Sequence, residues 1–105
     1  MLLLSLLIHH ALSRKALGIR IYPESKECHI DLQFEDRIEK LSPAPLSING
    51  MLVIYLAASI GIRPDMLPPV ESGVEVETNM GKYTIFGKTG MTELGEKIEI
   101  RWQKK

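Results

Sequence analysis

Cysteine is nearly absent from this chain, since Cys28 is the only one among its 105 residues. A single cysteine excludes a disulfide within the chain and suits a reducing compartment such as the cytoplasm. The sequence also lacks the Cys-x-x-Cys and His-Glu-x-x-His spacings of common metal sites. Cys28 and His29 are adjacent, and neighbouring side chains of an extended strand point to opposite faces. We therefore expect a cytoplasmic protein with no metal and no cofactor, in which Cys28 is a small core residue.

The sequence has no excess of either charge. It contains 13 Lys and Arg residues and 13 Asp and Glu residues, so its formal net charge is zero. Binding to nucleic acid or to an anionic membrane surface generally uses an excess of basic residues. We therefore expect no nucleic acid among its partners.

The N-terminal apolar run is too short to cross a membrane. It covers residues 2–8 and is interrupted by Ser5, whereas a spanning helix needs about 20 apolar residues. No basic residue precedes it, because Arg14 and Lys15 follow it, and no small-x-small cleavage site is evident. We interpret the run as the start of a packed helix, not as a signal peptide, and we expect no membrane insertion.

Residues 2–15 have the period of an amphipathic helix. Leu4, Leu7, Ile8 and Ala11 recur at i, i+3, i+4 and i+7, which gives one core-facing stripe. A second side of this helix is also apolar in its first turns. We expect another subunit, another domain or a close-packed loop to cover that side. The interface candidates on this helix are Leu2, Leu3, Leu6, His9 and His10. The paired histidines are most simply solvated, with a pH-sensing role as the alternative.

The next segments have the period of strands. Apolar and polar residues alternate over 17–22 and over 28–35, with the turn sequence PESK between them. These two segments predict a hairpin, and Ile38 and Leu41 indicate a short third strand.

Residues 46–60 predict a second helix, with Ser47 as its N-cap and its end near Gly61. This segment carries almost no charge. Such a helix is either buried on most sides or lies in an interface.

Three further segments alternate with period two, at 74–77, 83–85 and 98–102. The expected order is one helix, two or three strands, a second helix and three strands. This order predicts one α+β domain over residues 1–105, with an antiparallel sheet of five to six strands packed with two main helices.

The sequence GKTG resembles part of a phosphate-binding loop. Such a loop needs a glycine, four residues and then Gly-Lys-Ser/Thr, between a strand and a helix. Here Gly81 precedes Gly87 by six positions, one too many, and the intervening KYTIF favours a strand. We interpret Gly87, Gly90 and Gly95 as turn residues between strands. We therefore expect neither catalysis nor nucleotide binding. The residual nucleotide-binding candidates are Lys88, Thr89 and Lys97.

The end of this segment resembles a known family. MTELGEKIEIRW, with Gly95-Glu96-Lys97 at its centre, is similar to the PTxxGEKxVLRL stretch of type II secretion and type IV pilus assembly ATPases. That stretch closes the PAS-like N-terminal domain that precedes their motor domain. ALGIRIYPE at 16–24 is similar to the family's ASDIHIEPxE, and the helix at 46–60 matches a family helix. The resemblance covers nearly the whole chain in the family's order, and it implies a PAS-like sheet.

The departures from the family concern its arginines. In the family these help to contact nucleotide bound to the motor domain, and their positions fall here on Asp31, Gln33 and Phe86, and near Val74. Carboxylate, amide and phenyl groups cannot clamp phosphate as a guanidinium does. The Walker motifs of the motor domain are also absent from this sequence. The resemblance therefore implies a non-enzymatic interaction or regulatory domain that binds a secretion or pilus ATPase, another protein, or a second copy of itself.

A small-molecule sensor is the alternative, because PAS-like sheets often enclose a ligand. Its pocket-lining candidates are the inward positions Ile19, Leu32, Tyr83 and Trp102, which are more simply core residues.

Overall fold

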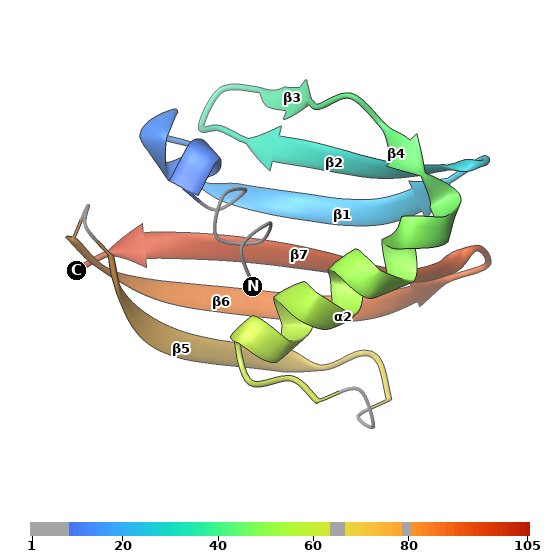
Figure 1. Cartoon of the computed structure of the whole chain (residues 1–105). Helices are drawn as coiled ribbons and strands as arrows, with labels where there is room; N and C mark the ends of the chain where they lie inside the picture. Colours follow the sequence, from blue (N-terminus) through green and yellow to red (C-terminus); the bar gives the residue numbers. More distant parts are fainter. Residues whose placement is uncertain (1–8, 64–66, 79–80) are drawn as a thin grey trace.

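The computed structural model describes residues 9–63, 67–78 and 81–105, whose arrangement is drawn in Figure 1. Helical residues 9–13 come first. The elements that follow are β1 (Gly18–Glu24), β2 (Glu27–Gln33), β3 (Ile38–Lys40), β4 (Ala44–Pro45), the short 3-10 helix η1 (Leu46–Ile48), α2 (Asn49–Ser59), β5 (Glu71–Thr78), β6 (Gly81–Thr92) and β7 (Gly95–Lys104).

The strands form one antiparallel sheet in the order β3-β2-β1-β7-β6-β5, and β4 pairs with β2 beside this path. The first and last long strands meet at its centre, where Ile19 lies opposite Ile100 and Ile21 opposite Ile98. The predicted α+β class and antiparallel sheet are confirmed. Six strands follow one another along the sheet, and the short β4 adds a seventh that the sequence did not predict.

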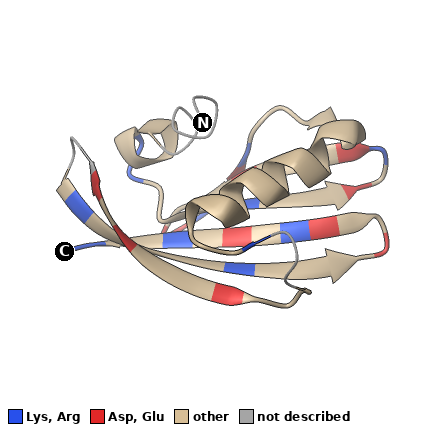
Figure 2. Cartoon of the chain, turned by 60° about the horizontal axis from the view of Figure 1, so that its bottom comes forward, with Lys and Arg blue, Asp and Glu red and all other residues tan. Residues whose placement is uncertain are grey.

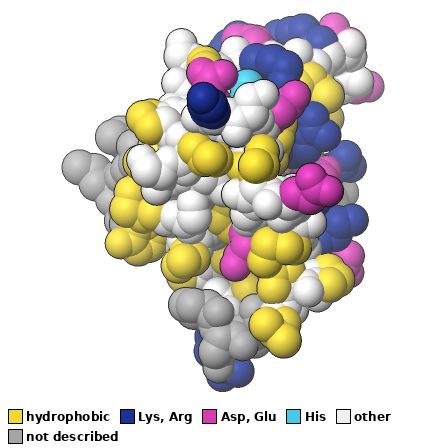
Figure 3. Space-filling model, turned by 90° about the vertical axis from the view of Figure 1, so that its right-hand side faces the viewer, with side chains coloured by type: hydrophobic (Ala, Val, Ile, Leu, Met, Phe, Trp, Pro, Cys, Tyr) yellow, Lys and Arg dark blue, Asp and Glu magenta, His cyan; other side chains and the backbone are white. Residues whose placement is uncertain are grey.

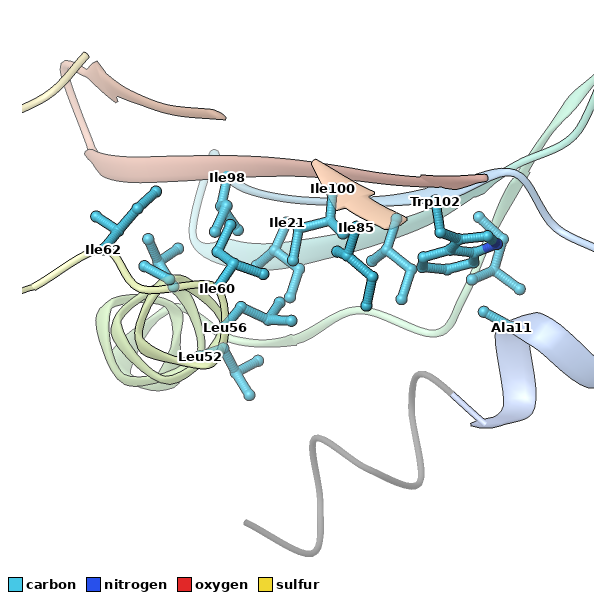
Figure 4. Close-up of a cluster of buried hydrophobic side chains, with 14 of the residues drawn as sticks. Ala11, Ile21, Leu52, Leu56, Ile60, Ile62, Ile85, Ile98, Ile100 and Trp102 are labelled. Atoms are coloured by element: carbon cyan, nitrogen blue, oxygen red, sulfur yellow. The ribbon is translucent and has the colours of Figure 1, made fainter. Parts of the chain in front are cut away.

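Both helical segments lie on one face of the sheet (Figure 1), and the core fills the space between them and the strands (Figure 4). Ile60 from the end of α2 points toward the sheet, and Trp102 lies beside Ala11 at the other end of the core. Within the described residues no helix covers the opposite side of the sheet, which we call the open face. Residues that alternate along each strand therefore meet either the core or solvent.

The second helix begins later than predicted, and Ser47 is not its N-cap. Residues 46–48 form η1, and the N-cap of α2 is Ile48, which makes no side-chain capping hydrogen bond. The first turn is held differently: Asn49 Nδ2 donates to the carbonyl of Glu96 at 2.8 Å, across to the start of β7. A tertiary hydrogen bond therefore fixes the start of α2 where the sequence suggested a local cap.

The predicted turns at Gly87 and Gly90 are wrong, because β6 runs without interruption from Gly81 to Thr92. Gly87 is buried beneath the end of α2, and a Cβ built on it would lie only 1.9 Å from Ile60 Cδ1. This glycine therefore allows the close approach of a helix to a strand. Gly95, with φ of +135°, is the first residue of β7 and directly follows the turn at residues 93–94.

The predicted helix over residues 2–15 is confirmed only in its described part. Residues 9–13 are helical, and residues 2–8 lie outside the described residues. The helix ends at Ser13, two residues early, because Lys15 has a left-handed backbone with φ of +64°.

Candidate functional site

The solvent side of α2 is apolar. We call its partly exposed residues Met51, Ile54 and Tyr55, which are 45%, 41% and 40% exposed, the α2 outer surface. They are spaced at i, i+3 and i+4, so they form one stripe. The inward side of α2 is apolar as well, with Leu52, Val53, Leu56 and Ala57 buried. A soluble helix normally places polar residues along its solvent side, whereas in α2 the exposed polar residue is Ser59, at its last position.

No residue of α2 is charged, and Figure 2 shows the helix without a basic or acidic band along its length. The start of α2 lies against the β6–β7 turn through the Asn49–Glu96 hydrogen bond. Leu94 in that turn is 49% exposed and extends the apolar region at this end of the molecule. Figure 3 looks at this end and shows exposed apolar side chains across it, with charged side chains gathered toward the open face of the sheet. The α2 outer surface is therefore an exposed apolar stripe on a helix that has no charged residue.

The interface candidates on the first helix are only partly described. His9 and His10 are exposed in helical residues 9–13, whereas Leu2, Leu3 and Leu6 lie outside the described residues. His10 approaches β3 closely enough that its charge contributes to lowering the pKa of Glu39. The structure therefore places His9 and His10 on the surface and does not bring them together with the α2 outer surface.

Arg14 and Glu39 fasten the end of this helix to β3. The two side chains form a bidentate pair in which Arg14 Nη2 donates to Glu39 Oε2 at 2.8 Å and Arg14 Nη1 donates to Oε1. The guanidiniums of Arg14 and Arg37 both lie over the ring of Phe34, at 5.6 and 4.1 Å from its centroid. The hydrogen bonds from Arg14 lower the pKa of Glu39, and the charges of Arg14, Arg37 and His10 add to this.

Glu39 is expected to titrate below its ordinary pKa of 4.5. Because folding lowers this pKa, its contribution to stability is complete above the ordinary value and is lost as the pH falls through the lowered value. Carboxyl-carbon NMR titration measures the midpoint directly. In Arg14→Gln we expect the midpoint to return toward 4.5. Arg37→Gln is the matched control and should change it less, because Arg37 Nη2 lies 3.8 Å from Glu39. Equal midpoints in the parent and in Arg14→Gln would contradict this assignment.

The buried carboxylate of Asp31 binds several polar side chains on the part of the open face formed by β1, β2 and β3. Asp31 on β2 has a side chain only 1% exposed, and register places it directly between Arg20 on β1 and Lys40 on β3. Asp31 Oδ2 accepts hydrogen bonds from Arg20 Nη2 at 3.2 Å and from the Tyr22 hydroxyl at 3.0 Å. Lys40 Nζ lies 3.5 Å from Asp31 Oδ1 and donates to the Tyr22 hydroxyl at 2.7 Å.

Asp31, Arg20, Tyr22 and Lys40, which we call the Asp31 cluster, stabilise one another's positions. The hydrogen bond to Tyr22 and the charge of Asp31 raise the pKa of Lys40, so its ammonium group remains charged beside the carboxylate. A buried carboxylate needs such partners, because its desolvation is otherwise costly. Asp31 falls at a polar position of the alternating pattern over 28–35, which gave no indication of its burial. The signal available was the presence of Arg20 and Tyr22 on the partner strand of a short hairpin.

The residual nucleotide-binding candidates Lys88, Thr89 and Lys97 all line one hollow, but their side chains lie on two faces of the sheet. Lys88 and Lys97 share the open face, where they help to line a hollow of about 750 Å³. Thr89 has its side chain on the core side instead, is buried, and its hydroxyl accepts a hydrogen bond from the Val70 amide at 3.2 Å. Lysine and threonine side chains on opposite faces of a strand cannot grip one phosphate group.

The carboxylate of Glu99 lies among the basic side chains that line this hollow. Register places Glu99 on β7 directly between Arg20 on β1 and Lys88 on β6. Arg101 Nε also lies 3.6 Å from Glu99 Oε1. Glu99 therefore offsets part of the positive charge at this hollow, whose charged lining residues are Arg20, Lys88, Lys97 and Glu99.

Cys28 is buried in the core, as predicted. Burial raises the pKa of its thiol, which keeps it protonated and unreactive. Over residues 9–63, 67–78 and 81–105, no three His, Cys, Asp or Glu side chains gather in a way that could hold a metal ion.

No model of a known protein family matches this chain, and no curated protein matches it either. In the part of the chain that the structure describes, no helix has the length and apolar character needed to span a bilayer.

Proposed function

We propose that this chain is a non-enzymatic interaction domain related to the N-terminal domain of secretion or pilus assembly ATPases, and that it binds a protein partner through the α2 outer surface. The partner is such an ATPase, another component of the same machine, or a second copy of this chain. A cytoplasmic location is part of the same proposal.

The fold supports the relationship. The five long strands lie in the order β2-β1-β7-β6-β5, with α2 in the connection between the two hairpins. An antiparallel sheet with helices on one face is what a PAS-like domain would need, and Gly95-Glu96-Lys97 begins its last strand. The position of a family arginine is occupied by Asp31, which is engaged by its own cluster. That use of the position supports a domain without nucleotide-facing chemistry.

The observation that carries the proposal is the α2 outer surface. Met51, Ile54 and Tyr55 expose apolar area on a helix that has no charged residue. Exposed apolar patches on a folded protein commonly mark interaction sites. Burying this stripe against a partner would give α2 the fully covered environment that its sequence requires.

The test is a titration of the isotope-labelled chain with a secretion or pilus ATPase encoded in the same genome. We expect amide resonances of α2 to change, and Ile54→Glu to weaken binding by at least about tenfold, as for a central interface residue. Phe86→Glu is the matched control, because Phe86 is 50% exposed but lies on the open face. The control should bind as the parent does.

Self-association is measured on the same variants by sedimentation equilibrium. If the partner is a second copy, Ile54→Glu should convert the chain to a monomer and Phe86→Glu should not. A chain that is monomeric at every concentration and binds no such ATPase contradicts the proposal, as does binding that survives Ile54→Glu.

The sensor alternative receives no support from the core. Ile19, Leu32 and Trp102 are buried among their neighbours, and Tyr83 is packed against the same cluster. These side chains fill the space that a ligand would occupy.

A further inference from the structure

The edge strand β5 differs from the other edge of the sheet. β5 has eight residues, and along its whole length it pairs with β6. At the opposite edge, β3 and β4 have only three and two residues. Within the described residues β6 is the only strand that pairs with β5, so β5 is the one long edge. Long edges offer backbone groups to a further strand unless they are protected.

The hydrogen bonds show which residues of β5 face outward. The Thr89 amide donates to the Val70 carbonyl at 2.8 Å, just before β5 begins, so Val70 turns its backbone toward β6. In antiparallel pairs such residues alternate with residues whose backbone groups point away. The outward backbone groups of β5 therefore belong to Glu71, Gly73, Glu75 and Glu77.

The three glutamates among these residues place their side chains on the open face. Glu71 lies opposite Lys88 and Glu77 opposite Lys82, while Glu75 pairs with Lys105. Each glutamate thus has a basic neighbour on its inner side. A carboxylate has enough acceptor sites to bind a second basic group as well. On the outer side of each glutamate, a basic side chain of an added strand could occupy these sites. Figure 2 shows acidic bands and no basic band along β5.

The intervening side chains have a different character. Ser72, Val74 and Val76 are half-buried on the core side, and the two valines pack against the core. A strand added to β5 would place its own side chains next to theirs and complete their burial. The pattern that fits this edge is therefore a basic residue opposite each glutamate, alternating with an apolar residue.

We propose that β5 is a docking edge for an extended segment of another protein in which basic residues alternate with apolar ones. Addition of a strand to a sheet edge is a general mode of peptide recognition, in which backbone hydrogen bonds give affinity and alternate side chains give specificity. A second copy of β5 does not fit, because its glutamates would lie beside these ones. This edge is separate from the α2 outer surface, so the two proposals stand or fall independently.

The probe is an acetylated and amidated peptide of alternating lysine and valine, eight residues long to match β5. We expect saturable changes in the amide resonances of Glu71, Gly73, Glu75 and Glu77, together with slower hydrogen exchange of these amides. Gly73→Pro removes an outward N–H without removing a hydrogen bond to β6, and should abolish binding. Gly73→Ala is the control. Like proline it adds a Cβ, which would lie 3.2 Å from Phe86 Cδ1, but it keeps the N–H, so it should bind as the parent does.

Charge is tested with two matched double variants. Glu75→Lys/Glu77→Lys should weaken binding by about tenfold and favour a peptide of alternating glutamate and valine instead. Glu24→Lys/Glu27→Lys makes the same change of charge around the β1–β2 turn and should leave binding unchanged. Ile54→Glu should leave it unchanged as well, which separates this test from that of the α2 outer surface.

Two results would overturn the proposal. The first is the absence of saturable changes in β5, which would assign the glutamates only the role of preventing strands from pairing at this edge. The second is peptide binding that persists in Gly73→Pro or is lost equally in both double variants, which would show nonspecific attraction.

Discussion

Replacing Trp102 with alanine is expected to lower the free energy of unfolding by about 3–5 kcal/mol, the range for removing a large buried aromatic side chain. Trp102 is 8% exposed and lies near the end of β7. Its indole Nε1 donates to the Ala16 carbonyl at 2.7 Å, and its amide donates to the Leu17 carbonyl at 3.2 Å. The side chain thus joins the last strand to the segment between the first helix and β1. Such a loss is a large fraction of the stability of an ordinary domain.

Denaturant unfolding followed by circular dichroism measures this loss without relying on tryptophan fluorescence. Trp102→Phe keeps an aromatic ring but removes the indole donor, so the hydrogen-bond part of its cost is about 1 kcal/mol. Phe86→Ala removes an aromatic side chain that is half exposed on the open face and should cost less than Trp102→Ala. Equal costs for Phe86→Ala and Trp102→Ala would contradict the central role of Trp102.

Replacing Gly87 with alanine is expected to lower the free energy of unfolding by about 1–3 kcal/mol, as overpacking of a filled core does. The added Cβ would lie 1.9 Å from Cδ1 of Ile60, which is itself buried at 1% exposure. Either this side chain or the end of α2 must therefore move. Gly90→Ala is the matched control on the same strand, because its Cβ would meet the flexible and exposed side chain of Lys97 at 2.9 Å. We expect a much smaller loss for the control.

A double-mutant cycle tests the contact itself. Ile60→Val removes the methyl group that the new Cβ would meet, at a cost of about 0.5–1.5 kcal/mol by itself. The combined variant should be more stable than the sum of the two single losses predicts, because the clash is relieved. Strict additivity of the two substitutions would show that Gly87 and Ile60 do not share this contact.

The local period of the sequence predicted most elements correctly. The alternation over 17–22, 28–35, 74–77 and 98–102 corresponds to β1, β2, β5 and β7. The same reasoning failed at Gly87 and Gly90, which were assigned to turns because glycine is common there. Their position in β6 depends on what packs against the strand, and a sequence pattern does not report that.

The sequence also indicated some features of the candidate sites but not others. The absence of charge on residues 49–59 already indicated that the second helix lies in a core or an interface. Only the structure showed that one side of this helix is buried while Met51, Ile54 and Tyr55 face solvent. The burial of Asp31 was not predictable, because it depends on the register that places Arg20 and Lys40 on its two sides.

The sequence by itself determined the α+β class, the periods of the elements and the balance of charge, because these depend on residue type and spacing along the chain. The tertiary structure decided the central pairing of β1 with β7, the place of Gly87 beneath Ile60 and the exposure of β5 as the long edge. Each of these depends on contacts between residues far apart in the chain. Their formation is governed by packing and backbone pairing across the whole sheet, which local preferences do not specify.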